Sequence, residues 1–312
     1  MPVTLPVYPG NKTRAEVATL RWVHENTTIP VPKVFDFDDS NDNEIGFEWI
    51  LMELMEGTSI HIRWRTMSME QKVAITKRIA KFQAELSGFG KAESLFRSIG
   101  TLDLRAFAQG NDVEHLEKVA PGLFVSHEFF MGDHLHYDIP RGPFRSSHDW
   151  LSAELNIILL AQKTRRRRGI LPVARKLLPL VPKMFPPALD EPETTGLYHH
   201  DLHLDNILVN EEGEITAVLD CECVSAMPLW MATKVPKFLD EPAREEEPQR
   251  NLVEYEATPL QKVYEATLRQ LWPEWPLEES YAIAACDGIW VKRARKWADC
   301  MEKGKTMRFE DA

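Results

Sequence analysis

The clearest pattern of apolar and polar positions lies between residues 197 and 222, and it predicts a β-hairpin. Ile207 to Val209 is one short apolar run and Ile215 to Leu219 is another, as expected for two short strands. Asn210-Glu-Glu-Gly213 between them has the residues of a turn, with glycine where a positive φ is easiest. A polar loop precedes the first strand and Asp220 follows the second. The hairpin therefore presents polar side chains from both ends of the stretch.

Most of the remaining chain is predicted to be helical, with strands near the N-terminus. Ser68-x-x-Gln71 has the pattern of a capping box. The helix that follows has apolar residues on one face and ends at Gly88. Thr13-x-x-Glu16 has the same pattern and predicts a helix from Thr13 to about Glu25. Strands are expected at Lys33–Asp38 and Phe47–Leu54.

Further elements are predicted with less distinctive patterns. A hairpin would pair Leu123–Phe130 with Leu135–Ile139, and would place His134 and His136 on a strand surface. A helix would begin at Ser147 or Asp149, another would open at Thr258 and Pro259, and a last one would run through residues 283–301.

Composition narrows the class of protein. A chain of 312 residues can bury a large core and form two lobes or domains. The net charge of −11 excludes a general nucleic-acid binder, which needs a phosphate-neutralising surface. The four cysteines form no CxxC pair, and no apolar run reaches the length of a membrane span. We expect a cytoplasmic monomer that binds neither nucleic acid nor membrane.

The polar residues around the hairpin match one chemistry. In kinase-type phosphoryl transfer a loop aspartate accepts the proton of the attacking hydroxyl. An asparagine five residues later and an aspartate after the next strand hold the metal ions. Asp201 and Asn206 have that spacing, and Asp220 follows one hairpin later. Their oxygen atoms are the ligands that Mg²⁺ requires.

The segments HHDLHLDNILV and AVLDCE resemble the aminoglycoside phosphotransferase and choline kinase family. The resemblance extends more loosely through IPVPKVFDFD, WILMELMEG and SAMPLW. It implies an α+β, bilobal, protein-kinase-like fold, with a partial N-lobe at residues 1–56 and a mainly helical C-lobe at residues 57–312. One departure is Cys221, where the family usually has an aromatic residue, and this change would loosen the packing beside Asp220.

The resemblance also implies a function and a set of site residues. The chain would transfer a phosphoryl group from ATP to a hydroxyl of a small molecule. Asp201 would be the catalytic base and His203 would brace the catalytic loop, while Asn206 and Asp220 would hold Mg²⁺. On the nucleotide side, Glu16 would occupy the position of the glutamate that pairs with the ATP-binding lysine.

The same resemblance places Glu53 and Leu54 in the hinge that contacts adenine. The window where relatives carry the ATP-binding lysine is MPVTL, which contains neither lysine nor arginine, and no Gly-rich hairpin precedes Thr13. Lys12 lies just before the expected helix and is a poor substitute. The nucleotide-binding lobe is therefore expected to be truncated, which would impair ATP use.

Other interpretations remain open at this stage. Asp201 and Asn206 could be turn formers, His203 a packing histidine, and Glu16 only part of a capping box. The residues His199, His200, Asp201 and His203 could instead bind Zn²⁺. The missing glycine loop and lysine favour two alternatives to an active kinase, a catalytically inactive kinase-like binding module and the truncated product of a longer kinase gene.

Overall fold

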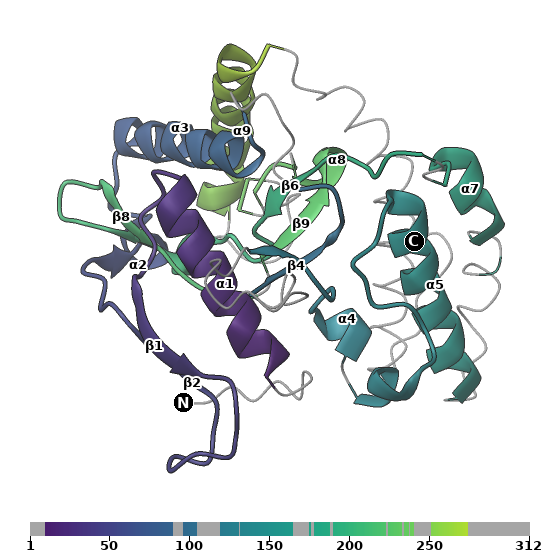
Figure 1. Ribbon diagram of the computed structural model, residues 1–312. Coiled ribbons are helices and arrows are strands. Elements are labelled where there is room, and N and C mark those ends of the chain that lie inside the picture. Colours follow the sequence, from purple (N-terminus) through teal and green to yellow (C-terminus); the bar gives the residue numbers. More distant parts are fainter. Residues whose placement is uncertain are drawn as a thin grey trace.

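The computed structural model in Figure 1 combines helices with small antiparallel sheets. It describes residues 10–89, 96–104, 119–130, 132–164, 175, 178–187, 190–222, 224–232, 234–236, 238–239 and 251–273. The MPVTL window and the expected last helix at residues 283–301 lie outside these ranges. Within them, no helix is both long and apolar enough to cross a membrane.

The first helix, α1 (Asn11–Asn26), packs with its apolar side against strand β4 (Gly100–Asp103). It also contacts the ribbon formed by β1 (Val34–Asp38) and β2 (Trp49–Met52). The strands β1 and β2 pair antiparallel, with Phe37 opposite Ile50, and project away from the other sheets in Figure 1. The two predicted N-terminal strands are thus present, one or two residues shorter at their ends.

The predicted capping box at Thr13 is wrong. The helix α1 begins two residues earlier, after Gly10, whose φ of 85° suits glycine. The hydroxyl of Thr13 instead donates to Oε2 of Glu48 at 2.6 Å, and the backbone N–H of Gly10 donates to Oε1 of the same carboxylate at 2.8 Å. A distant glutamate from the loop before β2 therefore stabilises the start of α1, favourably placed for the helix dipole.

The segment after the ribbon confirms the second capping box. Strand β3 (Thr58–Ser59) and helix α2 (Ile60–Arg63) lead to α3 (Met69–Leu86). The Ser68 hydroxyl accepts from the Gln71 N–H and the Gln71 side chain accepts from the Ser68 N–H. The helix ends as predicted beside Gly88, which has a φ of 77°.

A four-stranded antiparallel sheet in the order β5-β4-β9-β6 lies in the middle of the molecule. Its strands come from distant parts of the chain: β4 (Gly100–Asp103), β5 (Ala120–Pro121), β6 (Thr195–Tyr198) and β9 (Ser225–Pro228). Because β6 leads into the predicted catalytic loop and β9 follows Asp220, this sheet fixes both ends of the candidate site.

The hairpin predicted between residues 123 and 139 is wrong. The structure has helix α4 (His127–Phe130) and a 3₁₀ helix (Gly132–His136) there, so His134 and His136 are not on a strand. Phe124, Phe129 and Phe130 are buried with Trp150 of α5 (Ser147–Thr164). Packing of these rings on α5 outweighs the strand preference of the apolar run. The predicted start of α5 at Ser147 is confirmed.

The described C-terminal part is helical, as predicted, with one corrected boundary. A 3₁₀ helix (Leu178–Leu180) and α7 (Val181–Met184) precede β6, and α8 (Leu229–Ala232) follows β9. Helix α9 runs from Asn251 to Leu271 and contains Pro259 in its interior, so the expected start at Thr258 is wrong. Extensive contact with α3 compensates for the backbone hydrogen bond that proline cannot donate.

Three clusters of buried apolar side chains hold these elements together. One joins α2, α3 and α9 to the predicted hairpin through Ile207 and Val209. A second surrounds α5, and the third joins α1 to the central sheet and includes Val218 and Cys221. The hairpin contributes to two of the clusters, so its position relative to α1 and α3 is fixed by packing.

Candidate active site

The predicted hairpin is present and is formed by β7 (Ile207–Val209) and β8 (Ile215–Val218). Ile207 lies opposite Val218 and both are buried, while β7 also pairs with β3. Beyond the paired strands, the Leu219 N–H donates to the Asn206 carbonyl at 2.8 Å. This last bond brings the residue before Asp220 next to Asn206, as the spacing of the motif predicted.

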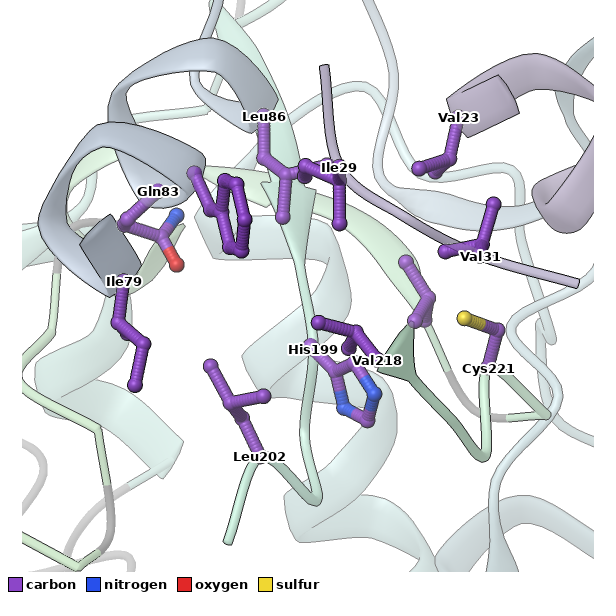
Figure 2. Close-up of a pocket in the computed structure, with 12 residues that line it drawn as sticks. Val23, Ile29, Val31, Ile79, Gln83, Leu86, His199, Leu202, Val218 and Cys221 are labelled. Atoms are coloured by element: carbon purple, nitrogen blue, oxygen red, sulfur yellow. The ribbon is translucent and has the colours of Figure 1, made fainter. Parts of the chain in front are cut away.

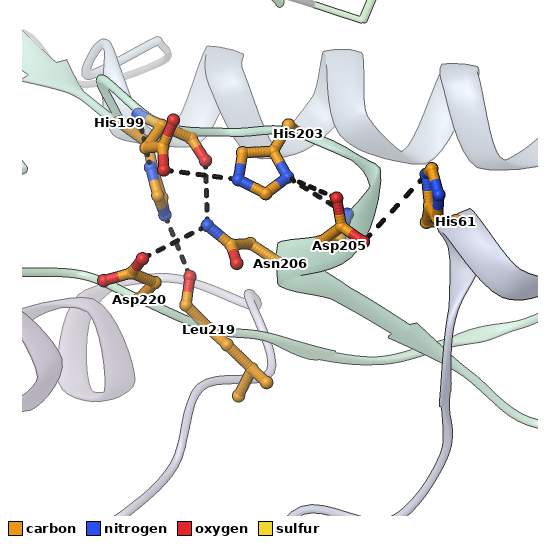
Figure 3. Close-up of polar contacts among 8 residues, drawn as sticks. His61, His199, His203, Asp205, Asn206, Leu219 and Asp220 are labelled. Carbon is orange, nitrogen blue, oxygen red and sulfur yellow. Dashed lines mark hydrogen bonds and ion pairs between the residues drawn. The ribbon is translucent and has the colours of Figure 1, made fainter. Parts of the chain in front are cut away.

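Asn206 contacts both predicted aspartates, and Figure 3 shows its contact with Asp220. Its Nδ2 donates to the backbone carbonyl of Asp201 at 3.0 Å and lies 3.4 Å from Oδ2 of Asp220. Because the amide nitrogen is directed at these two partners, the amide oxygen is left for another ligand. Asp201, Asn206 and Asp220 therefore lie together, although their roles remain predictions.

His203 lies between two carboxylates. Its Nε2 is 3.2 Å from Oδ2 of Asp201, and its Nδ1 accepts from the Asp205 backbone N–H at 3.1 Å. Oδ2 of Asp205 is 3.3 Å from the same Nδ1. Since Nδ1 accepts a hydrogen bond, the proton of neutral His203 is on Nε2 and is donated to Asp201. The bracing role of His203 stays a prediction.

His199 has a structural role that the sequence did not reveal. Its Nδ1 accepts from the Asp201 backbone N–H at 3.3 Å, and its Nε2 donates to the Leu219 carbonyl at 3.1 Å. Burial lowers the pKa of His199, so the ring is neutral. One buried imidazole thus ties the catalytic loop to the residue before Asp220. Its only sequence signal was its place two residues before Asp201.

Asp220 has an unusual backbone and a crowded electrostatic environment. Its φ is 63°, the only positive value among the non-glycine residues that the structure describes. Partial desolvation raises the pKa of its carboxyl, and the charges of Glu222 and Asp201 raise it further. This excess of negative charge is what a bound cation would relieve.

Glu16 of α1 faces the same charged region. Burial raises its pKa to about 7, and the carboxylates of Glu222 and Asp220 add to the shift, whereas Lys12 opposes it. Lys12 forms an ion pair with Glu222. The structure therefore places Glu16 within electrostatic reach of Asp220, and the lysine near Glu16 is Lys12 of the same helix.

A small cavity of about 30 Å³ lies behind the catalytic loop, between α1, α3 and the end of β8. Figure 2 shows His199, Leu202 and Cys221 at its edge, with Ile79, Gln83 and Leu86 of α3 on another side. Cys221 lies on the wall of this cavity, and the expected loosening of the packing beside Asp220 stays a prediction. The thiol is buried and its pKa is raised, so it is not reactive.

Glu53 and Leu54 lie on the segment between β2 and β3. Oε2 of Glu53 accepts from the Lys33 N–H at 3.2 Å, and the Leu54 side chain is 93% exposed. These contacts do not test the predicted hinge role.

The zinc interpretation finds no support in the described part of the chain, where no three histidine, cysteine, aspartate or glutamate side chains are grouped to hold a metal ion. His200 packs edge-on against the ring of Tyr198 at 4.9 Å, so it points into an aromatic cluster. The oxygen atoms of Asn206 and Asp220, by contrast, fit the preferences of Mg²⁺.

A family model described as the phosphotransferase enzyme family, APH, matches residues 6–232. The chain belongs to this family. The match covers the candidate site from Glu16 to Asp220, and the phosphotransferase family is the one that the hairpin motif resembled. The predicted kinase-like α+β fold class is thereby confirmed.

Curated relatives of this phosphotransferase-family chain are longer proteins. A subtelomeric hrmA-associated cluster protein of Aspergillus fumigatus is 30% identical over 136 residues, which cover 43% of this chain and 26% of that protein. Altered inheritance of mitochondria protein 9, a mitochondrial protein of Kluyveromyces lactis, is 24% identical over 322 residues, covering 86% of this chain and 51% of that protein. The chain thus spans between a quarter and a half of the length of these relatives.

Solved structures with a similar arrangement include a putative aminoglycoside phosphotransferase from Ralstonia eutropha, with 16% identity and a TM-score of 0.44 over 84% of this chain and 67% of that one. The ternary complex of APH(2")-IIa with streptomycin and ATP has 12% identity and a TM-score of 0.46 over 92% and 79% of the two chains. The predicted lobe boundary at residues 56 and 57 stays a prediction.

Proposed function

We propose that this chain binds a magnesium–ATP complex and transfers a phosphoryl group to a hydroxyl of a small molecule. The observation that carries the proposal is the position of Asn206, whose amide joins the backbone of Asp201 to the carboxylate of Asp220. A candidate base and two candidate metal ligands are thereby held close together, which kinase-type transfer needs.

The residues of the chain have distinct roles in this proposal. Asp201 accepts the proton of the acceptor hydroxyl, and the Nε2–H of His203 holds one of its oxygens so that the other is directed at the acceptor. Asn206 and Asp220 offer oxygen atoms to Mg²⁺, which when bound neutralises charge on the phosphates. His199 keeps the two halves of the site in register.

The nucleotide side of the proposal rests on fewer contacts. Leu54, with its exposed side chain, offers an apolar surface on the segment where the hinge is predicted, and Glu53 keeps that segment paired to Lys33. We further propose that the acceptor is a small molecule, because the net charge of −11 disfavours a nucleic acid, and that the chain acts as a monomer.

Calorimetry with ATP and, in parallel, GTP tests nucleotide binding in the presence of Mg²⁺. We expect binding by the wild-type chain and loss of binding in Asp220→Ala. Absence of binding at millimolar nucleotide by a folded chain would contradict the proposal.

Turnover separates an enzyme from a binding module. Against a panel of hydroxyl-bearing small molecules, Asp201→Asn should retain nucleotide binding but lose about 10²–10⁴-fold in rate, the usual contribution of a general base. Wild-type turnover in this variant would rule out Asp201 as the base. Nucleotide binding without turnover on any acceptor by the wild-type chain would favour the catalytically inactive module.

A further inference from the structure

Negative charge is concentrated beside the predicted metal ligand Asp220. Glu222 follows it by two residues, and Glu16 approaches from α1, a separate element. The ion pair between Lys12 and Glu222 joins α1 to the turn that carries Asp220 and Glu222, and Glu16 lies one helical turn after Lys12. A folded chain without a bound cation must offset part of this charge by other means.

Among the described residues, Lys12 supplies the positive charge that is paired with Glu222. It lies in the first turn of α1, one turn before Glu16, and its ammonium forms an ion pair with Glu222. The two side chains are only 20% and 25% exposed, so water screens the pair less than it would on the surface. The Lys12 charge also acts on Glu16 and on Asp220, where it opposes the upward shifts in pKa.

The position of Lys12 is fixed from outside the catalytic loop. The start of α1 is held by Glu48, which accepts hydrogen bonds from Gly10 and Thr13. Arg14 forms an ion pair with Asp39, which anchors the same turn to the end of the β1–β2 ribbon. The lysine therefore projects from a fixed helix end toward the turn that carries Asp220.

We propose that Lys12 is a tethered counter-ion of the predicted metal site, which pairs with Glu222 and competes with a divalent cation that binds next to this carboxylate. The inference rests on the proposed function for the assignment of Asp220 as a metal ligand. An ammonium beside Glu222 repels a divalent ion that binds next to it. A nucleotide, which carries several negative charges, can accommodate both cations at once.

As a consequence, Lys12 should affect the binding of a metal ion alone and the binding of a metal–nucleotide complex in opposite directions. Free divalent ions bind weakly because they must displace or tolerate the ammonium of Lys12. Binding of the metal–nucleotide complex benefits from the same lysine, since its phosphates attract the released ammonium. Removing the charge of Lys12 should therefore strengthen the binding of the free divalent ion and weaken the binding of the metal–nucleotide complex.

The experiment measures Mn²⁺ binding to the full chain by electron paramagnetic resonance, without nucleotide. We expect Lys12→Met to bind Mn²⁺ about tenfold more tightly than wild type, and Lys12→Arg to remain within about twofold of wild type because the charge is kept. The matched control is Lys262→Met, which removes an exposed lysine on α9 and should not change Mn²⁺ affinity.

Titration with Mn²⁺ and ATP together gives the second result. Lys12→Met should bind the complex at least about threefold more weakly than wild type, since it loses one favourable charge. Circular dichroism checks that each variant is folded. Where Lys12→Met does not fold, Lys12→Gln, which keeps a hydrogen-bond donor for Glu222, carries the same test.

The inference is overturned if a folded Lys12→Met or Lys12→Gln variant binds Mn²⁺ no more tightly than wild type. The same holds if the variant shows no measurable binding at millimolar Mn²⁺. The outcome is separable from that of the proposed function. If the Lys12 variants change Mn²⁺ affinity as expected but the chain binds no nucleotide, the counter-ion role of Lys12 stands and the proposed phosphotransferase function does not. If the chain binds nucleotide with an Mn²⁺ affinity independent of Lys12, the reverse holds.

Discussion

Replacing Glu16 by glutamine should change how the stability of the protein depends on pH. The folded-state pKa of Glu16 is about 7, against an ordinary value of 4.5, because burial and the neighbouring carboxylates disfavour its charge. A raised pKa means that the folded state holds this proton more tightly than the unfolded state does. The free energy of unfolding therefore falls as pH rises through the folded-state pKa.

The size of the effect follows from the two pKa values. Between pH 6 and pH 8 the wild-type chain should lose about 1 kcal/mol of stability through Glu16. Glutamine resembles the protonated form at every pH and cannot contribute this loss. Titrating groups away from this cluster of charges are the same in both proteins and cancel in the comparison. The free energy of unfolding of Glu16→Gln, relative to that of wild type, should thus be about 1 kcal/mol higher at pH 8 than at pH 6.

The assay is urea denaturation followed by tryptophan fluorescence at pH 6, 7 and 8, with EDTA present so that no divalent cation binds the carboxylates. Equal denaturant slopes in the two proteins check that the free energies are comparable. The control is Glu25→Gln, an exposed glutamate near the other end of α1. A Glu16→Gln difference that stays constant within about 0.3 kcal/mol from pH 6 to pH 8 would refute the reasoning.

Three further substitutions test other parts of the structure. Gly57→Ala should lower the free energy of unfolding, measured by urea denaturation, by about 2–4 kcal/mol, because its Cβ would lie 2.5 Å from Oγ1 of Thr216 and its φ is 131°. Gly46→Ala, which has a positive φ but open space around it, should lower the same free energy by only about 1 kcal/mol. Equal losses in the two variants would contradict the steric argument. Glu48→Ala should lower the free energy of unfolding by about 1–2 kcal/mol, because it removes the hydrogen-bond acceptor at the start of α1. Glu44 is exposed in the same loop, so Glu44→Ala should leave the free energy of unfolding unchanged. Similar values for the two variants would argue against the capping role of Glu48. Asn206→Ala should weaken Mn²⁺ binding at least about tenfold in the resonance assay, and unchanged affinity would exclude Asn206 as a ligand or as support for Asp220.

The parts of the fold that sequence reasoning predicted are those specified by neighbouring residues. The β7–β8 hairpin has two short apolar runs and a glycine at the turn position with φ of 88°, and the Ser68–Gln71 box closes within one helical turn. Local propensity and the final structure agree at these places, so a single sequence is sufficient.

The errors occur where a distant residue decides the local structure. Thr13 has the sequence of a cap, but Glu48, 35 positions away, takes its hydroxyl. The apolar run that contains the phenylalanines at residues 124, 129 and 130 has the pattern of a strand. In the structure these side chains pack against α5, and part of the run is helical. No local pattern carries this information, because it arises only from tertiary contacts.

The candidate site shows the same division. The motif places Asp201, Asn206 and Asp220 in order along the chain, and the structure brings them together as a hairpin should. The roles of His199 and Lys12 depend on contacts with Leu219 and Glu222. Those contacts form only when the loop, the hairpin and α1 are assembled, so sequence alone gave His199 no positioning role and treated Lys12 as a poor substitute.

The left-handed backbone at Asp220 bears on how this chain could evolve. Glycine and asparagine adopt a φ near 63° more easily than other residues, and in the standard genetic code each is one base change from aspartate. Both replacements would keep the fold and remove the carboxylate. Loss of this carboxylate by drift is therefore structurally easy, and the chain nonetheless carries the charged residue. Sequencing of close natural variants would show whether selection retains aspartate where the backbone would accept its neutral replacements.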